Sequence, residues 1–432
     1  MEIQTNLLFS YLCEKFPENK EYYELIRYEM DSRIYYYGDH YKHHLERKPA
    51  IFEQLKDSLV EISLSLLIFI RSKKKQITRP AILSTAYFNI QNHFDQNRLI
   101  ISRPPWQYNE YKYNFYNYEL YKEANKIKRQ LLTKDAAELM TNTFFEKVRN
   151  FENKLEKWIL EKDFKAVFVP SNVGFFDKLA IRIFRKINRP SFTFIHGLPG
   201  AYSKIDNNLA DYLAVWGESI RNNYIREGIN AKKIIVTGHP KYITELRDSL
   251  TFNLNNVLVI SKSLPGAQVG GRYTLRDRSN LIYYLLLIRD VLKSLGVSKA
   301  RLRPHPSENP SWYTRFLGTD FFVLDNQPLH LSLSVSGVVI GPTSTVFVEA
   351  LQAGVNYVIF EPRLNDGRGL DGGSVVRPFD GTDQNVPSAD TPERLSEILR
   401  ERRSVDSGIL KDYFSQKFDV AEVIRIIENH KR

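Results

Sequence analysis

The segment Gly337–Glu361, GVVIGPTSTVFVEALQAGVNYVIFE, decides how this chain folds. It contains a short apolar strand, a Gly-Pro turn, a Thr-Ser-Thr cluster that begins a helix, a glycine that ends the helix, and a second apolar strand. The stretches 337–340 and 357–360 are apolar on both faces, which is typical of a parallel sheet covered by helices on its two sides. The segment therefore predicts one βαβ unit of an α/β fold.

The same alternation extends to both sides of this unit. In the second half we predict strands at 257–261, 300–303 and 321–324, and a crossover helix at 278–295. The first half repeats the theme less regularly, with helical patterns such as 177–186 between strands. Its predicted strands are 81–84, 99–102, 167–169, 192–195, 213–216 and 234–237. We therefore expect two Rossmann-like α/β domains with an added helical N-terminal portion.

A chain of 432 residues is long enough for two domains that each bury a core. We place the N-terminal domain with its helical extension at 1–250 and the C-terminal Rossmann-like domain at 251–406. The boundary lies in the largely polar run 247–256, RDSLTFNLNN. The last segment, 407–432, is expected to be a helix that packs across the seam between the domains.

The composition, with 43% hydrophobic and 26% charged residues, indicates a folded globular protein. The single cysteine, Cys13, excludes an intrachain disulfide framework and fits a reducing cytoplasm. No basic region precedes the first apolar residues, which argues against a secretory signal. The net charge of +11 favours an anionic partner, such as a phosphorylated substrate, an acidic glycan, a lipid headgroup or a nucleic acid.

The most apolar run is 59–70, LVEISLSLLIFI, and the basic residues 71–75, RSKKK, follow it directly. The run is too short to span a bilayer and contains Glu61. We interpret it as a helix buried in the core, with an interfacial membrane anchor as the alternative. The tyrosine-rich stretch 108–121 is interpreted as tyrosines that pack between helices, with an aromatic platform as the alternative.

The helix start within the opening segment is a candidate phosphate site. Thr343, Ser344 and Thr345 place hydroxyls and backbone N–H groups at a helix N-terminus, where unsatisfied donors attract phosphate oxygens. Glu349 lies one helical turn further on, within reach of ribose hydroxyls. A plain Ser/Thr N-cap with a solvent-facing glutamate would give the same pattern.

A second candidate is the segment 301–309, RLRPHPSEN, at the end of a predicted strand, where open parallel sheets bind ligands. His305 lies between two prolines, which restrict its backbone, so its imidazole is expected to project from a fixed point. Such an imidazole could donate to a leaving phosphate or act as a general acid, and Arg303 would help to keep the site positive. A structural histidine is the alternative.

A third candidate is the loop 261–271, SKSLPGAQVGG, which offers Ser261, Lys262 and several glycines to a phosphate. It lacks the GxxxxGK[ST] pattern, so it is not a P-loop. We also find no DxD, HExxH or Cys/His cluster, so no catalytic metal is predicted.

Polar residues in the first half also follow predicted strands. His196 lies in IHGLPG at 195–200, and Asp177 follows SNVG at 171–174. Both are candidates for a catalytic base or nucleophile. Asp177 as a first-turn helix acid and His196 as a turn residue are the structural alternatives.

Taken in order, five motifs resemble those of bacterial surface-polysaccharide glycosyltransferases of the GT-B fold. They are IHGLPG at 195–200, DYLAVWGE at 211–218, VTGHPKY at 236–242, RPHPSE at 303–308 and GPTSTVFVEALQAGVNYVIFEP at 341–362. Within that group, RPHP resembles the His-Pro motif of enzymes that use CMP-activated ulosonic acids such as sialic acid and Kdo. The Ser/Thr pair resembles their donor-phosphate motif. The resemblance covers about residues 168–362.

This resemblance implies that His305, Ser344 and Thr345 hold the CMP phosphate and that Glu349 holds the ribose. The donor it implies is a nucleotide sugar, and because the sequence has no metal-binding motif we expect a metal-independent transferase without a cofactor. The N-terminal domain would bind an anionic glycan or glycolipid acceptor, with peripheral contact to the inner face of the membrane and no nucleic acid. The acidic-acidic-Gly base motif of some sialyltransferases has no clear counterpart here, which leaves the base and the stereochemistry open.

Two other families share several of these motifs. CDP-glycerol glycerophosphotransferases carry an acidic turn where this chain has Gly-Pro-Thr-Ser-Thr. Non-hydrolysing UDP-sugar 2-epimerases have an HPxxNP-like run, which 305–310 fits, but usually show paired glycines before the ribose acids, where this chain has 343–345. A non-catalytic nucleic-acid binder is a third alternative, although no RRM, HTH or KH pattern occurs and the basic residues are spread along the chain.

Overall fold

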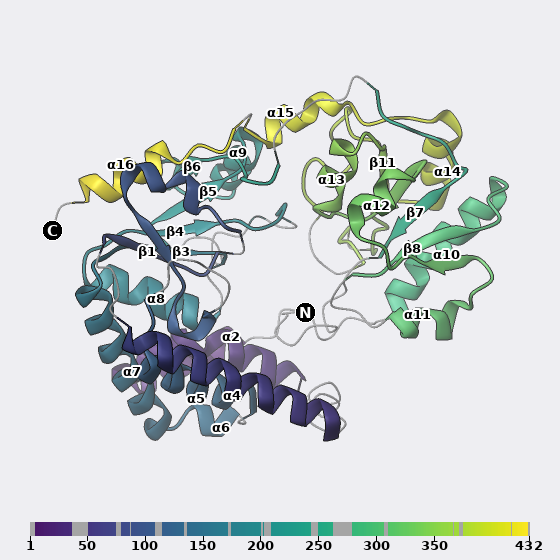
Figure 1. Cartoon of the computed structure of the whole chain (residues 1–432). Coiled ribbons are helices and arrows are strands. Elements are labelled where there is room, and N and C mark those ends of the chain that lie inside the picture. The colour runs from purple at the N-terminus through teal and green to yellow at the C-terminus, as the bar shows by residue number, and fades with distance from the viewer. Residues whose placement is uncertain are drawn as a thin grey trace.

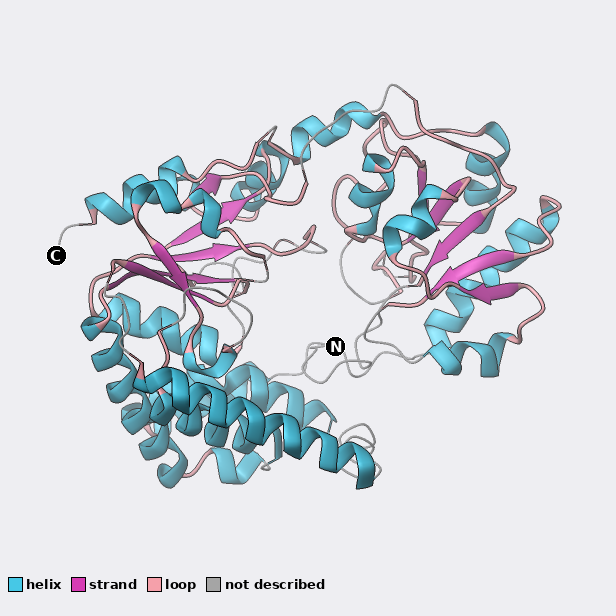
Figure 2. Cartoon of the chain, viewed as in Figure 1, coloured by secondary structure: helices cyan, strands magenta, loops and turns pink. Residues whose placement is uncertain are grey.

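The structure is a computed structural model that describes residues 5–36, 51–74, 79–86, 88–108, 115–133, 136–171, 174–199, 202, 209–242, 249–261, 279–305, 310–365, 367–370, 375–415 and 417–430. Figures 1 and 2 show two α/β lobes, each built around one sheet, and a layer of helices beneath the first lobe. The C-terminal helices run along the top from the second lobe back to the first.

Each lobe contains one six-stranded sheet. The strands of the first are β1 (Ala81–Ser84), β2 (Ile100–Ser102), β3 (Phe164–Val169), β4 (Ser191–Phe194), β5 (Tyr212–Val215) and β6 (Ile234–Val236). Those of the second are β7 (Val257–Ile260), β8 (Ala300–Arg303), β9 (Phe322–Leu324), β10 (Val338–Gly341), β11 (Tyr357–Phe360) and β12 (Ser388–Ala389). The strand orders are β2-β1-β3-β4-β5-β6 and β12-β11-β10-β7-β8-β9, and every pair is parallel.

Helices flank both sheets. The first lobe and its helical layer contain α1 (Thr5–Lys15), α2 (Lys20–Tyr36), α4 (Ile51–Lys73), α5 (Tyr118–Thr133), α6 (Ala136–Leu139), α7 (Asn142–Glu161), α8 (Phe175–Lys186) and α9 (Glu218–Arg226). The second lobe contains α10 (Ser279–Ser294), α11 (Pro310–Leu317), α12 (Leu329–Ser334), α13 (Val346–Gln352) and α14 (Pro392–Glu401), and the chain ends with α15 (Leu410–Tyr413) and α16 (Ala421–Asn429). The predicted fold class, two Rossmann-like domains with a helical N-terminal portion, is confirmed.

Every strand predicted from the sequence is present, with small shifts at the ends. β3 begins at Phe164 rather than at residue 167, because the half-buried Lys165 interrupts the apolar pattern on which the prediction relied. β12 was not predicted, since a strand of two residues carries no periodic signal.

Alternate residues of a strand point to opposite faces of a sheet, and both faces of the first sheet are buried. Leu83 and Val167 pack in a core that includes residues of α2, α7 and α8. Ile82 and Phe168 pack on the other face, in a core that α16 completes. The C-terminal helix is therefore part of the first lobe's own core.

The second sheet is buried in the same way. Val259 and Ile340 pack against residues of α10 and α14. Leu258 and Val339 lie in a core that also contains residues of α13, of the first lobe and of α15. Apolar packing thus continues from one lobe to the other.

The structure corrects the interpretation of 59–70 as a buried helix. Within residues 59–74 only Ile68 is buried, and Leu64 is half-buried. α4 rests with this one face on α5 and on the tyrosines that precede α5, whereas the other apolar side chains of 59–70 face solvent. The prediction fails because the run is apolar around the whole helix, but only one face packs on another described segment. No helix in the described part of the chain is both long and apolar enough to cross a membrane.

The tyrosine-rich stretch packs as predicted where the structure describes it. Tyr108 and Tyr121 are buried beside Ile68, and Tyr116 and Tyr118 pack against them. The tyrosines between residues 109 and 114 lie outside the described residues.

The segment after α14 crosses from the second lobe to the first. It forms two helices, α15 and α16, rather than the single helix expected for 407–432. Phe414 packs on Trp216 with ring centres 5.4 Å apart. The backbone N–H groups of Ser415 and Asp419 donate to the carbonyls of Trp216 and Thr237, each at 2.7 Å. The crossing is therefore held by main-chain hydrogen bonds as well as by apolar packing.

Two glycines allow the crossing segment to approach the first lobe. A Cβ on Gly217 would overlap the backbone of Tyr413, and a Cβ on Gly238 would overlap the backbone of Lys417. Gly238 also has a φ of +76°, in the left-handed region.

We predict that Gly238→Ala lowers the free energy of unfolding by about 1 to 3 kcal/mol more than Gly296→Ala does, because only the first creates an overlap with another segment. Gly296 is the matched control, since its φ is +80° and no atom lies within 4 Å of the position that a Cβ would take. Urea unfolding of both variants measures the difference. If both variants lose the same free energy of unfolding, the backbone at Lys417 moves aside for a methyl group at little cost.

Candidate functional site

The second sheet has one point at which its strand order reverses. β8 and β9 lie on one side of β7, and β10 to β12 lie on the other. Ligands of open parallel sheets bind outside the carboxyl ends of the strands at such a point. Ser261 follows β7, the turn 342–345 follows β10, and His305 lies two residues after β8. With neighbouring strands about 4.8 Å apart, these three segments emerge within about 10 Å along one edge.

Two side chains hold the turn after β10 in place. One belongs to β11 and the other to the residue directly after β11. The Tyr357 hydroxyl donates to the carbonyl of Pro342 at 2.7 Å, and the N–H of Thr343 donates to Oε1 of Glu361 at 2.6 Å. Glu361 is only 2% exposed. We did not single out Glu361 from the sequence, where its only signal is an acidic residue directly after an apolar strand. Both contacts fix the turn before any ligand binds.

The hydroxyls of Ser344 and Thr345 are the groups best able to bind an anion here. Ser344 Oγ accepts from the N–H of Val346, and Thr345 Oγ1 accepts from the N–H of Leu198, each at 3.2 Å. A hydroxyl oxygen that accepts in this way still has its own proton to donate. α13 spans only about two turns, so a phosphate at this turn would be held by these hydroxyls rather than by the helix dipole.

His305 is fixed through its backbone. Its N–H donates to Oγ of Ser261 at 2.9 Å, and the N–H of Ser261 donates to the carbonyl of Arg303 at 3.1 Å. Ser261 is buried and His305 is half-buried. Ser261 therefore serves as a support for His305. Lys262 and the rest of the loop to residue 278 lie outside the described residues.

Arg303 has protein partners. Its guanidinium donates to the carbonyl of Gln327 at 2.6 Å and lies 3.5 Å from the carboxylate of Asp325. Arg301 contacts the same buried carboxylate at 2.7 Å. A contact of Arg303 with a nucleotide would require it to leave these partners.

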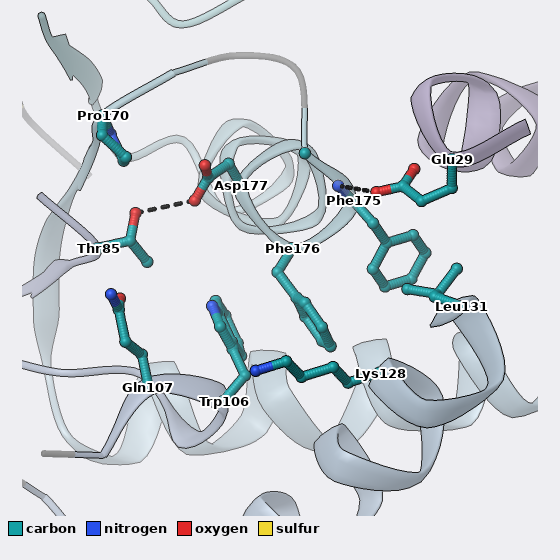
Figure 3. Close-up of a pocket in the computed structure, with 11 residues that line it drawn as sticks. Glu29, Thr85, Trp106, Gln107, Lys128, Leu131, Pro170, Phe175, Phe176 and Asp177 are labelled. Atoms are coloured by element: carbon teal, nitrogen blue, oxygen red, sulfur yellow. Dashed lines mark hydrogen bonds between the residues drawn. The ribbon is translucent and has the colours of Figure 1, made fainter. Parts of the chain in front are cut away.

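The first sheet also has one reversal point, between β1 and β3, and a pocket of about 340 Å³ lies there (Figure 3). Residues at the ends of β1, β2 and β3 line it together with the start of α8 and two residues of α5. These are Thr85, Trp106, Gln107, Pro170, Gly174, Phe175, Phe176, Asp177, Lys128 and Leu131, with Glu29 from α2. The pocket therefore occupies the position at which an α/β sheet binds its ligand.

Asp177 is the titratable group best placed for proton transfer in this pocket. Figure 3 shows its carboxylate directed toward Thr85, whose hydroxyl donates to Oδ1 at 2.8 Å. Ser171 lies 3.5 Å from Oδ2. Burial raises the pKa of Asp177 to about 6, and the two hydroxyls offset only part of this effect. A carboxylate with such a pKa can accept a proton near neutral pH.

The remaining walls combine aromatic and polar groups. Trp106 stacks on Phe176 with ring centres 4.9 Å apart. Gln107 Oε1 is buried and has no hydrogen-bond partner within the described part of the chain, so it is available to a ligand hydroxyl. Apolar walls with a few polar groups are typical of small-molecule sites. We missed Trp106, Gln107 and Lys128 at the level of sequence because they come from elements far apart in the chain.

The two lobes meet where these two sites adjoin. The backbone of Leu198 donates to Thr345, and a Cβ on Gly197 would lie only 3.2 Å from Thr345 Oγ1. The loop after β4 therefore rests directly on the turn after β10.

A second contact between the lobes involves Glu349. Its Oε1 pairs with Lys241 and lies 3.4 Å from the hydroxyl of Tyr242. Both partners follow β6 of the first lobe. Glu349, the candidate residue for ribose binding, is thus already engaged by residues of the other lobe.

His196 lies between the two sites. It is exposed at the end of β4, and its Nδ1 lies 3.2 Å from the carbonyl oxygen of Pro170, which lines the pocket. Its neighbour Gly197 touches Thr345. The segment from His196 to Leu198 therefore connects the rim of the pocket at Pro170 to Thr345. Among the described residues, no group of three His, Cys, Asp or Glu side chains is arranged to hold a metal ion.

No family model and no curated protein matches this sequence. Solved structures are similar at low identity. The lipopolysaccharide outer core galactosyltransferase WaaB in its apo form is 12% identical, with a TM-score of 0.43 over 81% of this chain and 98% of that chain. The UDP-GlcNAc 2-epimerase from Neisseria meningitidis bound to UDP-GlcNAc is 13% identical, with a TM-score of 0.44 over 81% and 97%. Anabaena HepE in complex with UDP-glucose is 11% identical, with a TM-score of 0.41 over 81% and 98%. Similarity at this level does not decide function, which has to be argued from the site.

We predict that Asp177→Asn lowers the rate of the catalysed reaction on the order of 10² to 10⁴, because it removes the proton acceptor of the pocket. The wild-type rate should fall as the pH drops through about 6, since the pKa of Asp177 is raised to that value. A pH–rate profile of both proteins tests this. A wild-type profile that stays flat down to about pH 4, the usual pKa of an aspartate, would exclude Asp177 as the base.

The same substitution should not destabilise the fold. Because burial raises the pKa of Asp177, the native state is less stable with the carboxylate ionised, and this cost is complete above about pH 6. As the pH falls from there toward about 4, the native state binds the proton first and wild-type stability rises. Asp177→Asn should therefore melt at or above the wild-type temperature at neutral pH, with the advantage lost in acid. Asp211→Ala is the contrast, since it removes the oxygen that accepts from the N–H and the hydroxyl of Ser191, and it should lower the melting temperature.

Proposed function

We propose that this chain is a nucleotide-sugar-dependent, metal-independent glycosyltransferase of the GT-B type. The observation that carries the proposal is the contact of the loop at Gly197 and Leu198 with Thr345. This contact joins a pocket with a proton acceptor on one sheet to a hydroxyl-bearing turn on the other. A group transfer between two substrates needs such an arrangement, because both reactants must be held side by side.

The proposed chemistry assigns one task to each lobe. In a direct displacement, the acceptor hydroxyl binds in the pocket of the first lobe and gives its proton to Asp177. Its oxygen forms a bond to the anomeric carbon of the donor sugar, and the bond from that carbon to the phosphate oxygen breaks. Negative charge then grows on the leaving phosphate, where Ser344, Thr345 and His305 would donate hydrogen bonds.

The donor we propose is a CMP-activated ulosonic acid, such as sialic acid or Kdo, on the basis of the His-Pro and Ser/Thr motifs. Glu349, which lies one helical turn after Thr345, would accept hydrogen bonds from the ribose hydroxyls. The acceptor would be an anionic glycan or glycolipid, for which Lys128 in the wall of the pocket supplies positive charge.

The main alternatives are a CDP-glycerol glycerophosphotransferase and a non-hydrolysing UDP-sugar 2-epimerase. An epimerase acts on one substrate and has no acceptor to bind. The pocket at Asp177, with its unpartnered Gln107 oxygen, offers a place for a second substrate and favours a transferase.

Calorimetric titration with CMP, CDP, UDP and GDP tests the nucleotide. We expect CMP to bind best, and Ser344→Ala combined with Thr345→Val to weaken binding by about 1.5 to 3 kcal/mol, because hydrogen bonds to a charged phosphate are lost. Ser334→Ala, which changes an exposed hydroxyl at the end of α12 in the same lobe, is the control. Unchanged affinity in the double variant would remove both hydroxyls from the site, and tighter binding of UDP than of CMP would contradict the proposed CMP-linked donor.

His305→Ala should lower kcat on the order of 10² to 10³ with a smaller effect on CMP affinity, because its hydrogen bond strengthens only as charge develops on the phosphate. His330→Ala is the matched control, since His330 is exposed on α12 of the same lobe. Steady-state kinetics and CMP titration on both variants separate the two effects. A His305→Ala enzyme that transfers at the wild-type rate would show that this histidine is structural.

A further inference from the structure

α4 carries a continuous apolar stripe that the described part of the chain leaves exposed. Leu59, Ile62, Leu66, Phe69 and Ile70 recur at helical spacing and are each between 42% and 64% exposed. At 1.5 Å per residue the stripe is about 17 Å long. Scattered exposed apolar residues are normal on proteins, but a contiguous patch of this kind marks an interaction surface.

The opposite face of α4 packs on the protein. Ile68 is fully buried against the tyrosines at 108 and 121, and Leu64 packs beside it. Figure 1 shows α4 on the outside of the helical layer, alongside α5. The body of the protein thus holds the helix by one side and presents the stripe to the surroundings.

The one carboxylate within the run is turned away from the stripe. Glu61 lies seven residues before Ile68, which places it on the packed face of the helix. It forms an ion pair with Arg129 of α5. The charge that interrupts the run in the sequence is therefore paired outside the stripe.

Positive charge lies at one end of the stripe. Lys73 and Lys74 are exposed, and Nζ of Lys73 lies 5.4 Å from the centre of the Phe69 ring. The partner must therefore bury apolar side chains and carry negative charge directly beside them. A bilayer with anionic lipids offers both, because its acyl chains lie directly beneath negatively charged headgroups.

We infer that α4 is an interfacial anchor that lays this stripe on an anionic membrane surface. The apolar side chains enter the boundary between headgroups and acyl chains, and the lysines bind lipid phosphates. The helix lies in the plane of the membrane rather than across it. This inference depends on α4 alone and is independent of the glycosyl transfer proposed above.

Cosedimentation of the full chain with vesicles tests the anchor. We expect the protein to bind vesicles of phosphatidylcholine mixed with phosphatidylglycerol, and to bind pure phosphatidylcholine less, since the lysines need anionic lipid. Ile62→Ser combined with Leu66→Ser should lower binding about tenfold or more, because two apolar side chains no longer leave water. Both positions are exposed, so the melting temperature of the variant should match that of the wild type.

The matched control changes two exposed apolar residues elsewhere, Phe316→Ser and Leu331→Ser in the second lobe, and should bind as the wild type does. A second variant, Lys73→Glu with Lys74→Glu, should lose the preference for anionic vesicles. The inference is overturned if the stripe variant binds as the wild type does, or if the wild type binds no vesicles. Sedimentation velocity without lipid covers the other occupant: a wild-type dimer that the stripe variant converts to monomer would make the stripe a contact between two copies of the chain.

Discussion

The packing of the crossing segment on Trp216 joins the two sheets, and the candidate site depends on it. Trp216 lies at the end of β5, where its ring packs on Phe414 and its carbonyl accepts from Ser415. A few residues later, α16 closes the core on the face of the first sheet opposite the helical layer. Loss of the crossing would expose that core as well as free the lobes from each other. Stability of the first lobe and the placing of the second are therefore coupled through one short stretch of chain.

Within each lobe, the parallel arrangement decides where polar residues can gather. All carboxyl ends of a parallel sheet lie on one edge, and a reversal of strand order opens a crevice there. Asp177, His196, His305 and Thr345 could be named from the sequence as neighbours of strand ends, because strand periodicity and turn residues are local signals. The pairing of strands and their parallel sense follow from the βαβ connections.

Other features depend on contacts that no local pattern encodes. Gln107 and Lys128 reach the pocket because β2 and α5 fold beside β1, and Glu361 reaches Thr343 across two adjacent strands. The exposure of α4 was mispredicted for the same reason, since apolar composition specifies that a helix can be buried but not which neighbours it finds. The sequence suggested that Arg303 keeps the phosphate site positive, but its guanidinium lies beside Asp325 on the loop after β9. Only the assembled fold reveals such partners.

Glu349, the residue that we propose binds the ribose, lies in the contact between the lobes. Lys241 and Tyr242 both approach its Oε1, so a ribose bound to this carboxylate, as proposed, would share it with the first lobe. A ribose that binds the carboxylate of Glu349 would weaken its contacts with Lys241 and Tyr242, and these contacts would in turn weaken binding of the ribose. Pairing of Lys241 with Glu349 also brings a cation of the first lobe to the edge of the second sheet where we propose that the nucleotide binds. Thr345, one helical turn before Glu349, accepts from Leu198, so in the proposed reaction the binding of the donor and the position of the acceptor pocket would be coupled.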